Sequence, residues 1–289
     1  MNHTLVLTAA LGELHDDAVT AASKVIGATP HWLSPGTACE FRDTDAGILA
    51  TVRGALAAHK VDANVVPNEH RRKRLLIADM DSTIIGCECI DEIADFAGIK
   101  PQIAAITERS MRGEIPFESA LRERVALLKG LPETTLGRVF KERVRLNDGA
   151  RILVRTMTEA GAKTALISGG FTFFTSRVAD AAGFATHKSN EFGIENGKLD
   201  GTVREPILGR EAKLQSLVAL AHEAGIDMKD TLAIGDGAND LAMITAAGLG
   251  IAYRAKPIVA EAADARLDHS DLSAVLYLQG FRETELVLD

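Results

Sequence analysis

Short apolar runs separated by helix-like segments dominate the chain after residue 74. Runs of this kind are typical of parallel strands that are buried on both faces. Helical spacing over Ala150–Ala160 and Lys213–Ala224 separates them, which predicts an α/β domain with a doubly wound, mostly parallel sheet. The four predicted strands are Leu75–Ala78, Thr164–Ile167, Thr231–Ile234 and Leu249–Ala252.

The first 66 residues follow a different pattern, with short strand-like and helix-like segments in alternation. The order predicts a small α+β unit that is similar in layout to the ferredoxin-like (ACT-like) domains that bind amino acids in regulatory proteins. We therefore predict two domains, residues 1–68 and 69–289. The predicted N-terminal strands are Leu5–Ala9, Cys39–Arg42 and Val61–Val66, and the predicted helices are Asp16–Ile26 and Ile48–His59.

Three further segments interrupt the α/β pattern. The interval from Ile90 to Leu146 looks helical throughout and is much longer than an ordinary crossover, so we predict a helical insertion at about residues 86–146. Asn196-Gly197, flanked by two short apolar segments, predicts a hairpin. The basic run His70–Arg74 is expected to be a solvated linker between the domains.

Composition narrows the class of protein. The chain has 289 residues, of which 46% are hydrophobic and 25% charged, as in ordinary globular proteins. Its 40 acidic and 32 basic residues give a formal net charge of −8, which argues against a nucleic-acid or anionic-membrane partner. Three cysteines, no long apolar run and no signal-peptide pattern at the N-terminus lead us to expect a cytoplasmic location.

Polar clusters follow three of the predicted strands. They are Asp79-Met80-Asp81-Ser82-Thr83, Ser168-Gly169-Gly170-Phe171 and Gly235-Asp236-Gly237-Ala238-Asn239-Asp240. In an open α/β sheet the carboxyl ends of the strands carry the chemistry. Carboxylates crowded there repel one another unless a cation holds them, and Mg²⁺ prefers such oxygen ligands. The clusters predict a magnesium site that acts on a phosphate.

The same strings carry a resemblance to a known family. Asp-x-Asp-x-Thr, Ser-Gly, an isolated lysine at Lys213 and Gly-Asp-Gly-x-Asn-Asp are the four motifs of the haloacid dehalogenase superfamily, in the same order. The longer strings resemble those of its phosphoserine phosphatases. Each string alone could be a turn or a helix cap, but the ordered set favours the superfamily.

The resemblance implies roles for the aspartates. Asp79 would be the nucleophile that forms an aspartyl-phosphate. Asp81 would act as general acid toward the leaving oxygen and then as general base for water. Mg²⁺ would be held by the carboxylates of Asp79 and Asp236 and by the backbone carbonyl of Asp81.

It also implies the groups that hold the phosphoryl oxygens. Ser168 and the amide of Gly169 would donate hydrogen bonds, and Gly170 would let the backbone approach closely. Lys213 would stabilise the charge on the phosphoryl group, and Asp240 would orient that lysine. Asn239 would contact the phosphate or the substrate.

The insertion would select the substrate as a cap over the site. Phosphoserine carries an ammonium and a carboxylate, which require an acid and a base. Glu88 and Arg124 match the residues that perform these roles in phosphoserine phosphatases, and Met111 and Phe117 match apolar pocket residues. Glu88 and Arg124 could also be ordinary surface charges, and the apolar pair could be plain cap core.

These inferences predict a Mg²⁺-dependent enzyme that hydrolyses O-phospho-L-serine to L-serine and phosphate. A phosphotransferase, or a phosphatase acting on another small phosphomonoester such as phosphohomoserine, remains an alternative. A regulatory amino-acid-binding protein with an inactive phosphatase domain is a second alternative. The N-terminal domain is a candidate interface for a homodimer. Cys87 and Cys89 lack the spacing of a zinc site and are expected to be packing residues.

Overall fold

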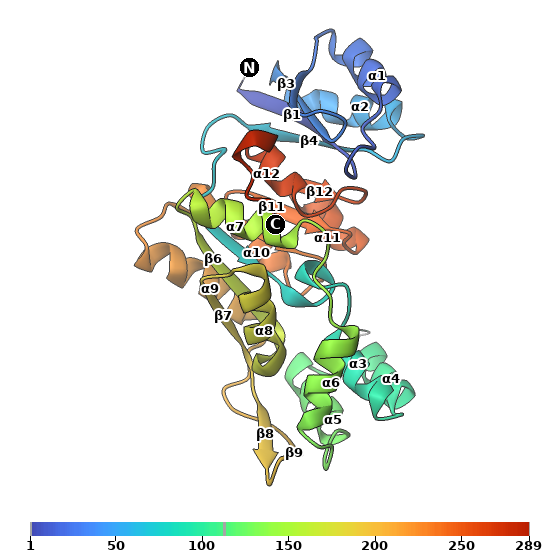
Figure 1. Cartoon of the computed structure of the whole chain (residues 1–289), viewed down its shortest axis with the longest axis vertical. Coiled ribbons are helices and arrows are strands. Elements are labelled where there is room, and N and C mark those ends of the chain that lie inside the picture. The colour runs from blue at the N-terminus through green and yellow to red at the C-terminus, as the bar shows by residue number, and fades with distance from the viewer. Residues whose placement is uncertain (1, 112–113, 289) are drawn as a thin grey trace.

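Six parallel strands form the central sheet of the computed structural model, which describes residues 2–111 and 114–288 (Figure 1). Within these residues every strand pair of the sheet is parallel. The central strand β5 is the fully buried run that the sequence predicts. In spatial order the strands are β12 (Ala265–Leu267), β11 (Gly250–Tyr253), β10 (Thr231–Gly235), β5 (Leu75–Ala78), β6 (Lys163–Phe171) and β7 (Thr186–Asn190).

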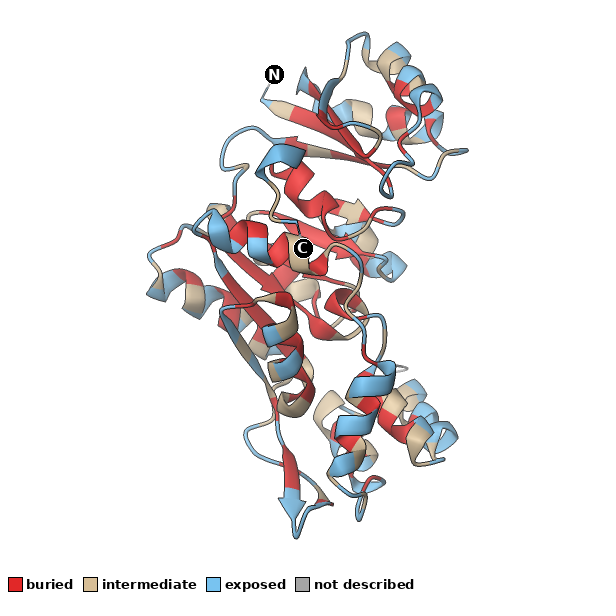
Figure 2. Ribbon diagram, in the orientation of Figure 1, coloured by how far each residue is buried: buried red, intermediate tan, exposed pale blue. Residues whose placement is uncertain are grey.

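Helices cover both faces of this sheet. Neighbouring strand residues point to opposite faces, so Leu76 packs in one core and Ile77 in the other. Figure 2 shows the strands buried and the outer faces of the helices exposed. The predicted doubly wound fold is confirmed. One face carries α7 (Ala150–Glu159), α8 (Thr172–Ala182) and α12 (Ala274–Leu278), and the other α9 (Arg210–Glu223), α10 (Leu241–Ala246) and α11 (Pro257–Ala262).

The N-terminal segment forms a separate antiparallel sheet in the order β2-β3-β1-β4. This order, with both helices in one core on the sheet, confirms the ferredoxin-like arrangement. The sheet's other face packs against α12. The elements are β1 (His3–Thr8), α1 (Asp16–Ile26), β2 (His31–Ser34), β3 (Ala38–Thr44), a turn of 3₁₀ helix (Ala46–Ile48), α2 (Leu49–Ala55) and β4 (Asp62–Pro67).

Side chains of β4 fasten this N-terminal unit to the edge of the central sheet. Asn64 is fully buried, donates to the backbone oxygen of Arg266 and accepts from the same residue's N–H, both at 2.9 Å. Asp62 accepts the backbone N–H groups of residues 268–270 and the hydroxyl of Ser270. The edge strand β12 is therefore covered by polar side chains rather than by another strand.

The expectation of a solvated linker at His70–Arg74 is wrong. Arg71 lies 2.8 Å from Glu40 and donates to the carbonyl of Leu278. Lys73 is buried, and its Nζ donates to the carbonyls of Lys229 and Gly248. The basic run therefore joins the N-terminal unit to the core through specific hydrogen bonds.

Four helices between β5 and β6 form the predicted insertion, called the cap here. An antiparallel bridge between Ile85 and Leu146 closes its base. The side chain of Met111 lies outside the described residues. The division of the chain at residue 68 and the cap limits remain predictions. The cap helices are α3 (Cys89–Phe96), α4 (Lys100–Met111), α5 (Phe117–Ala126) and α6 (Thr134–Arg143), and short helical turns cover Met80–Ile84, Met228–Asp230 and Glu283–Glu285.

The predicted hairpin is present as β8 (Phe192–Glu195) and β9 (Lys198–Val203), with both turn residues at positive φ. It extends from the core and packs against the cap (Figure 1). Leu199 exchanges backbone hydrogen bonds with Gly130 and Leu131 of the cap. The cap therefore has an attachment to the core beyond its own two chain connections. No helix of the described residues is long and apolar enough to cross a membrane.

Candidate active site

A lysine and two aspartates form a buried ion cluster where β5 and β10 end. The Nζ of Lys213 lies 2.7 Å from Asp79 Oδ1 and 2.5 Å from Asp240 Oδ1. All three residues are at most 5% exposed. Burial alone would lower the pKa of Lys213, but the charges of Asp240 and Asp79 outweigh it and raise that pKa. The lysine therefore stays charged beside Asp79.

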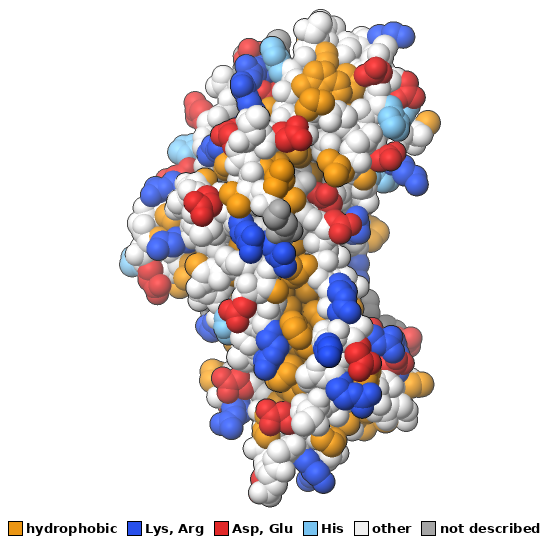
Figure 3. All heavy atoms as spheres, in the orientation of Figure 1, with side chains coloured by type: hydrophobic (Ala, Val, Ile, Leu, Met, Phe, Trp, Pro, Cys, Tyr) orange, Lys and Arg blue, Asp and Glu red, His pale blue; other side chains and the backbone are white. Residues whose placement is uncertain are grey.

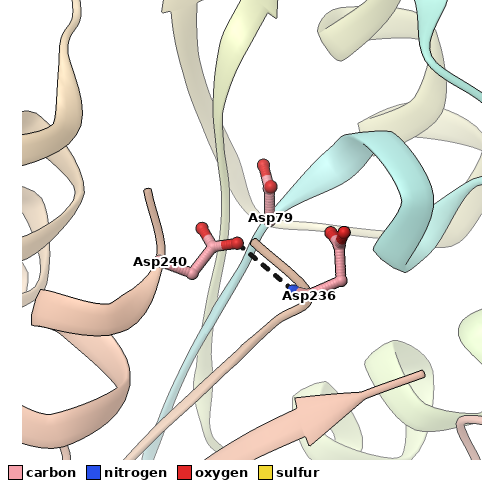
Figure 4. A group of neighbouring side chains, drawn as sticks. All are labelled: Asp79, Asp236 and Asp240. Carbon is pink, nitrogen blue, oxygen red and sulfur yellow. Dashed lines mark hydrogen bonds between the residues drawn. The ribbon is translucent and has the colours of Figure 1, made fainter. Parts of the chain in front are cut away.

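Asp240 shapes the loop as well as holding the lysine. Its Oδ2 accepts the backbone N–H group of Asp236 at 3.2 Å (Figure 4). It also accepts the backbone N–H group of Gly237 at 3.0 Å. Both of its oxygens are thus occupied by protein donors. The expected contact of Asp240 with Lys213 is present in this geometry, and the same side chain sets the position of Asp236.

Asp79 and Asp236 are the carboxylates left to hold a cation. Oxygens of Asp79, Asp236 and Asp240 lie within 4.8 Å of one another (Figure 4). Among the described residues, no donor bonds Oδ2 of Asp79 or of Asp236. Burial, then the charge of Asp240, raises the pKa of Asp79 well above its ordinary value and that of Asp236 to about 6. Three carboxylates against one lysine leave an excess of two negative charges, which fits a divalent cation.

Asp81 lies in the turn Met80–Ile84 that follows β5 and Asp79, and its own backbone is extended, with φ −65° and ψ 137°. Its Oδ1 accepts the N–H of Cys89 at 3.1 Å, so the start of the cap holds this carboxyl group. Burial, and then the charge of Glu88, raises the pKa of Asp81 to about 7. A carboxyl group with a pKa near neutrality can both donate and accept a proton at neutral pH.

The segment Ser168–Gly170, called the glycine loop here, lies near the end of β6, where the pairing with β7 shifts register. Ser168 is 1% exposed, and its Oγ accepts the N–H of Gly170 at 2.9 Å. A Cβ on Gly170 would lie 2.9 Å from Asp81 Oδ2, and one on Gly169 would lie 3.3 Å from Phe117. A side chain at either position would have to displace the carboxyl group of Asp81 or the ring of Phe117, so glycine suits this close approach to Asp81 and to the cap.

A cavity of about 460 Å³ joins these groups to the cap. Its volume suits a small molecule. Figure 3 shows hydrophobic side chains gathered between cap and core, with Lys and Arg on either side. The predicted residues that line the cavity are Asp79, Asp81, Glu88, Phe117, Arg124, Ser168, Gly169, Gly170, Asp236 and Asn239.

The cap supplies charges of both signs to this cavity. Arg124 is half-buried and donates to the carbonyl of Ala120 in its own helix. Burial lowers its pKa, while the carboxylates of Asp91 and Glu88 act in the opposite direction. Glu88 is exposed, and its Oε1 accepts the hydroxyl of Ser82 at 2.6 Å.

Several residues of the site were not predicted from the sequence. Thr83 donates to Asp236 Oδ1 at 3.0 Å, and its place in the Asp-x-Asp-x-Thr string was a usable signal. Asp91 and Lys256 line the cavity, but nothing in their local sequence distinguishes them from surface charges. Their place in the site depends on contacts between distant segments.

Comparisons with known proteins agree with this geometry. The family model for haloacid dehalogenase-like hydrolases matches residues 76–245. The chain belongs to the haloacid dehalogenase-like hydrolases. The hydrolase is 45% identical over 203 residues, 70% of its length, to a phosphoserine phosphatase from Archaeoglobus fulgidus. It is 47% identical over 204 residues, 71% of its length, to one from Haemophilus influenzae.

These matches span 59% and 65% of those two relatives. A solved structure resembles the hydrolase over nearly its whole length, including the N-terminal unit. It is a probable phosphoserine phosphatase from Vibrio cholerae, with a TM-score of 0.81 and 30% identity, covering 96% of this chain and 86% of that one. The two-part architecture is therefore shared with a relative of similar size.

Proposed function

We propose that this hydrolase cleaves O-phospho-L-serine to L-serine and phosphate, with Mg²⁺ as its cofactor. The observation that carries the proposal is one cavity in which Asp79, paired with Lys213, faces the cap residues Arg124 and Glu88. The core end of this cavity suits a phosphate, and the cap end offers partners for a carboxylate and an ammonium. The names of the relatives support the same substrate.

Substrate recognition is assigned to the cap. The guanidinium of Arg124 binds the substrate carboxylate through paired hydrogen bonds, and the carboxylate of Glu88 binds the ammonium. Phe117, which lies against Gly169, covers the phosphate end of the cavity. Met111 is proposed as a further apolar contact from the sequence alone.

In the first step a carboxylate oxygen of Asp79 attacks phosphorus, and the bond from phosphorus to the serine oxygen breaks. Asp81 gives its proton to that oxygen, for which a pKa of about 7 is suitable. The product of this step is an acyl phosphate on Asp79. Lys213, the Ser168 hydroxyl and the amide of Gly169 stabilise the charge on the phosphoryl oxygens.

In the second step water attacks the phosphorus of the acyl phosphate. Asp81, now ionised, takes a proton from this water, phosphate leaves, and the carboxylate of Asp79 is restored. Asn239 contacts the phosphate from the loop after β10. Mg²⁺, held by Asp79, Asp236 and the backbone carbonyl of Asp81, would neutralise the repulsion between nucleophile and phosphate.

Phosphate release from a panel of phosphomonoesters tests the proposal. We expect Mg²⁺-dependent turnover of L-phosphoserine, abolished by EDTA and by Asp79→Asn. Arg124→Ala should raise KM for phosphoserine about 30-fold or more, because a charge-assisted pair is lost, and leave KM for p-nitrophenyl phosphate nearly unchanged. Equal turnover of D-phosphoserine, phosphohomoserine and sugar phosphates would contradict the substrate. Phosphoryl transfer to an added alcohol would favour the phosphotransferase.

We also propose that the full chain forms a homodimer through its N-terminal unit. The edge strand β2 carries Trp32, whose exposed fraction of 40% is high for so large an apolar side chain. Light scattering that gives the mass of one chain at micromolar concentration would contradict this proposal.

A further inference from the structure

Asn190, the last residue of β7, reaches across to the glycine loop. Its side chain is 2% exposed. The Nδ2 donates to the carbonyl oxygen of Gly169 at 2.8 Å, and the Oδ1 accepts the N–H of Leu208 at 2.7 Å. One buried amide therefore joins the glycine loop to a segment 18 residues further along the chain than itself.

The β6–β7 ladder explains why a side chain is needed at this place. Its register shifts between Ile167 and Phe171, the stretch that contains the glycine loop. Phe171 pairs with Asn190 again beyond the shift. The bulged loop turns toward the cavity, and the amide of Asn190 supplies the hydrogen bond that the carbonyl of Gly169 needs.

The bond to Gly169 also orients the groups on the cavity side. In a trans peptide the C=O of Gly169 and the N–H of Gly170 point in opposite directions. Because Asn190 binds the carbonyl of Gly169, the N–H of Gly170 points toward Ser168 Oγ, which accepts it at 2.9 Å. An oxygen that accepts this bond keeps its own O–H to donate to a phosphoryl oxygen.

The second bond of Asn190 acts on the element that carries Lys213. Leu208 lies two residues before α9, and Lys213 is in the first turns of that helix. Fixing the N–H of Leu208 fixes where α9 begins and thus where the lysine enters the site. One side chain therefore bonds both the glycine loop and the segment that leads into the helix of Lys213.

We propose that Asn190 is a positioning residue for phosphoryl transfer, acting through the glycine loop and α9 without touching the substrate. This inference rests on the proposed function. Contacts with the glycine loop strengthen as the phosphoryl group becomes pentavalent, whereas phosphoserine is held chiefly by the cap. Loss of the Asn190 bonds should therefore reduce kcat more than it raises KM.

The test compares Asn190→Asp and Asn190→Ala with the native chain. Asn190→Asp keeps the size and the acceptor for Leu208 but lacks the NH₂ donor for Gly169. Asn64→Asp is a matched control, because Asn64 is also buried and also bonds one backbone C=O and one N–H. It lies at the interface with the N-terminal unit. Circular dichroism and thermal melts identify the folded fraction of each variant.

We expect kcat for phosphoserine to fall about 10- to 100-fold in both Asn190 variants. This is less than the roughly 100- to 1000-fold loss for removal of an oxyanion donor itself, because Asn190 acts through the glycine loop. KM should change less than about threefold, and inhibition by orthovanadate should weaken in step with kcat. Asn64→Asp should keep its kcat. An unchanged kcat in folded Asn190 variants, an equal loss in Asn64→Asp, or failure of both Asn190 variants to fold would overturn the proposal.

Failure of the proposed function would give a different result from failure of the positioning role of Asn190. If the native chain does not turn over phosphoserine, the substrate assignment fails, and the variants are compared on p-nitrophenyl phosphate. If it turns over neither compound, stabilisation of the chain by orthovanadate with Mg²⁺ is measured instead. Weaker stabilisation in the Asn190 variants alone would still support the positioning role, and equal stabilisation would overturn it.

Discussion

At the residue scale, the buried carboxylates of the site make the folding stability of the protein depend on pH. The pKa of Asp236 is raised from about 3.8 to about 6, so the folded state favours the protonated acid. Its contribution to stability is fully present below about pH 3.8 and is lost as pH rises through about 6. Without a cation, ionised Asp236 costs about 3 kcal/mol above that pH, because each pKa unit corresponds to about 1.4 kcal/mol.

Asp236→Asn should remove this cost. In EDTA we expect Asp236→Asn to melt at a higher temperature than the native chain above pH 7, and the gap to narrow toward pH 4. Mg²⁺ should raise the Tm of the native chain above pH 6 and have little effect on the variant. Melting curves from pH 4 to 8 measure both effects. A constant gap across this range would show that Asp236 does not ionise as described.

A residue of the site can be predicted from the sequence when it belongs to a motif formed by its own sequence neighbours. Asp79, Asp236 and Lys213 belong to motifs that can be read without knowing the fold. Asn190 has no such motif, because its role arises from a bulge in β6 and the return of the chain at Leu208. Positioning residues of this kind are visible only when distant segments are brought together.

At the scale of elements, the strongest predictions came from strands buried on both faces. The sequence predicts β5 because all four of its residues are apolar, and in the structure all four are buried. The edge strands β7 (Thr-His-Lys-Ser-Asn) and β12 (Ala-Arg-Leu) were missed, since one is polar and the other has three residues. The hairpin was found from its Asn-Gly turn, but a turn signal does not reveal that the hairpin packs against the cap.

The packing of this hairpin against the cap gives a prediction. Gly201 has a φ of +87°, and an added Cβ would lie 3.0 Å from Lys129 Cβ in the cap. Gly201→Ala should shift the cap, including Arg124 on α5, and raise KM for phosphoserine about three- to tenfold. Gly197→Ala is the control, because its φ is +72° but nothing lies within 4 Å. Both should lose about 1–2 kcal/mol from the positive φ.

Steady-state kinetics measure the change in KM that a shifted cap causes. Thermal melts measure the loss of stability that the positive φ causes. Equal KM values for Gly201→Ala and Gly197→Ala would show that the hairpin does not set the position of the cap. The kcat for p-nitrophenyl phosphate, which makes no use of Arg124, should stay close to the native value in both.

At the scale of the whole molecule, Asp62 joins the N-terminal unit to the core. Asp62→Ala leaves three backbone N–H groups at residues 268–270 without their acceptor. The hydroxyl of Ser270 keeps only its bond to Thr8 Oγ1. We expect a loss of about 3 kcal/mol, or a Tm lower by roughly 6–12 °C. Asp16→Ala, at the exposed start of α1, should have a much smaller effect. Calorimetry measures both, and equal Tm values would contradict the role of Asp62.

Asn64 binds the backbone of Arg266 in the edge strand β12, and removal of the N-terminal unit would remove these hydrogen bonds. A chain begun at β5 would leave the backbone of Arg266 as a free strand edge, which is a template for association with other chains. Such a fragment would keep Asp79, Lys213 and Asp236 and is still expected to precipitate. Making a compact version of the enzyme would require a proline or an inward-facing lysine in that strand to replace the lost cover.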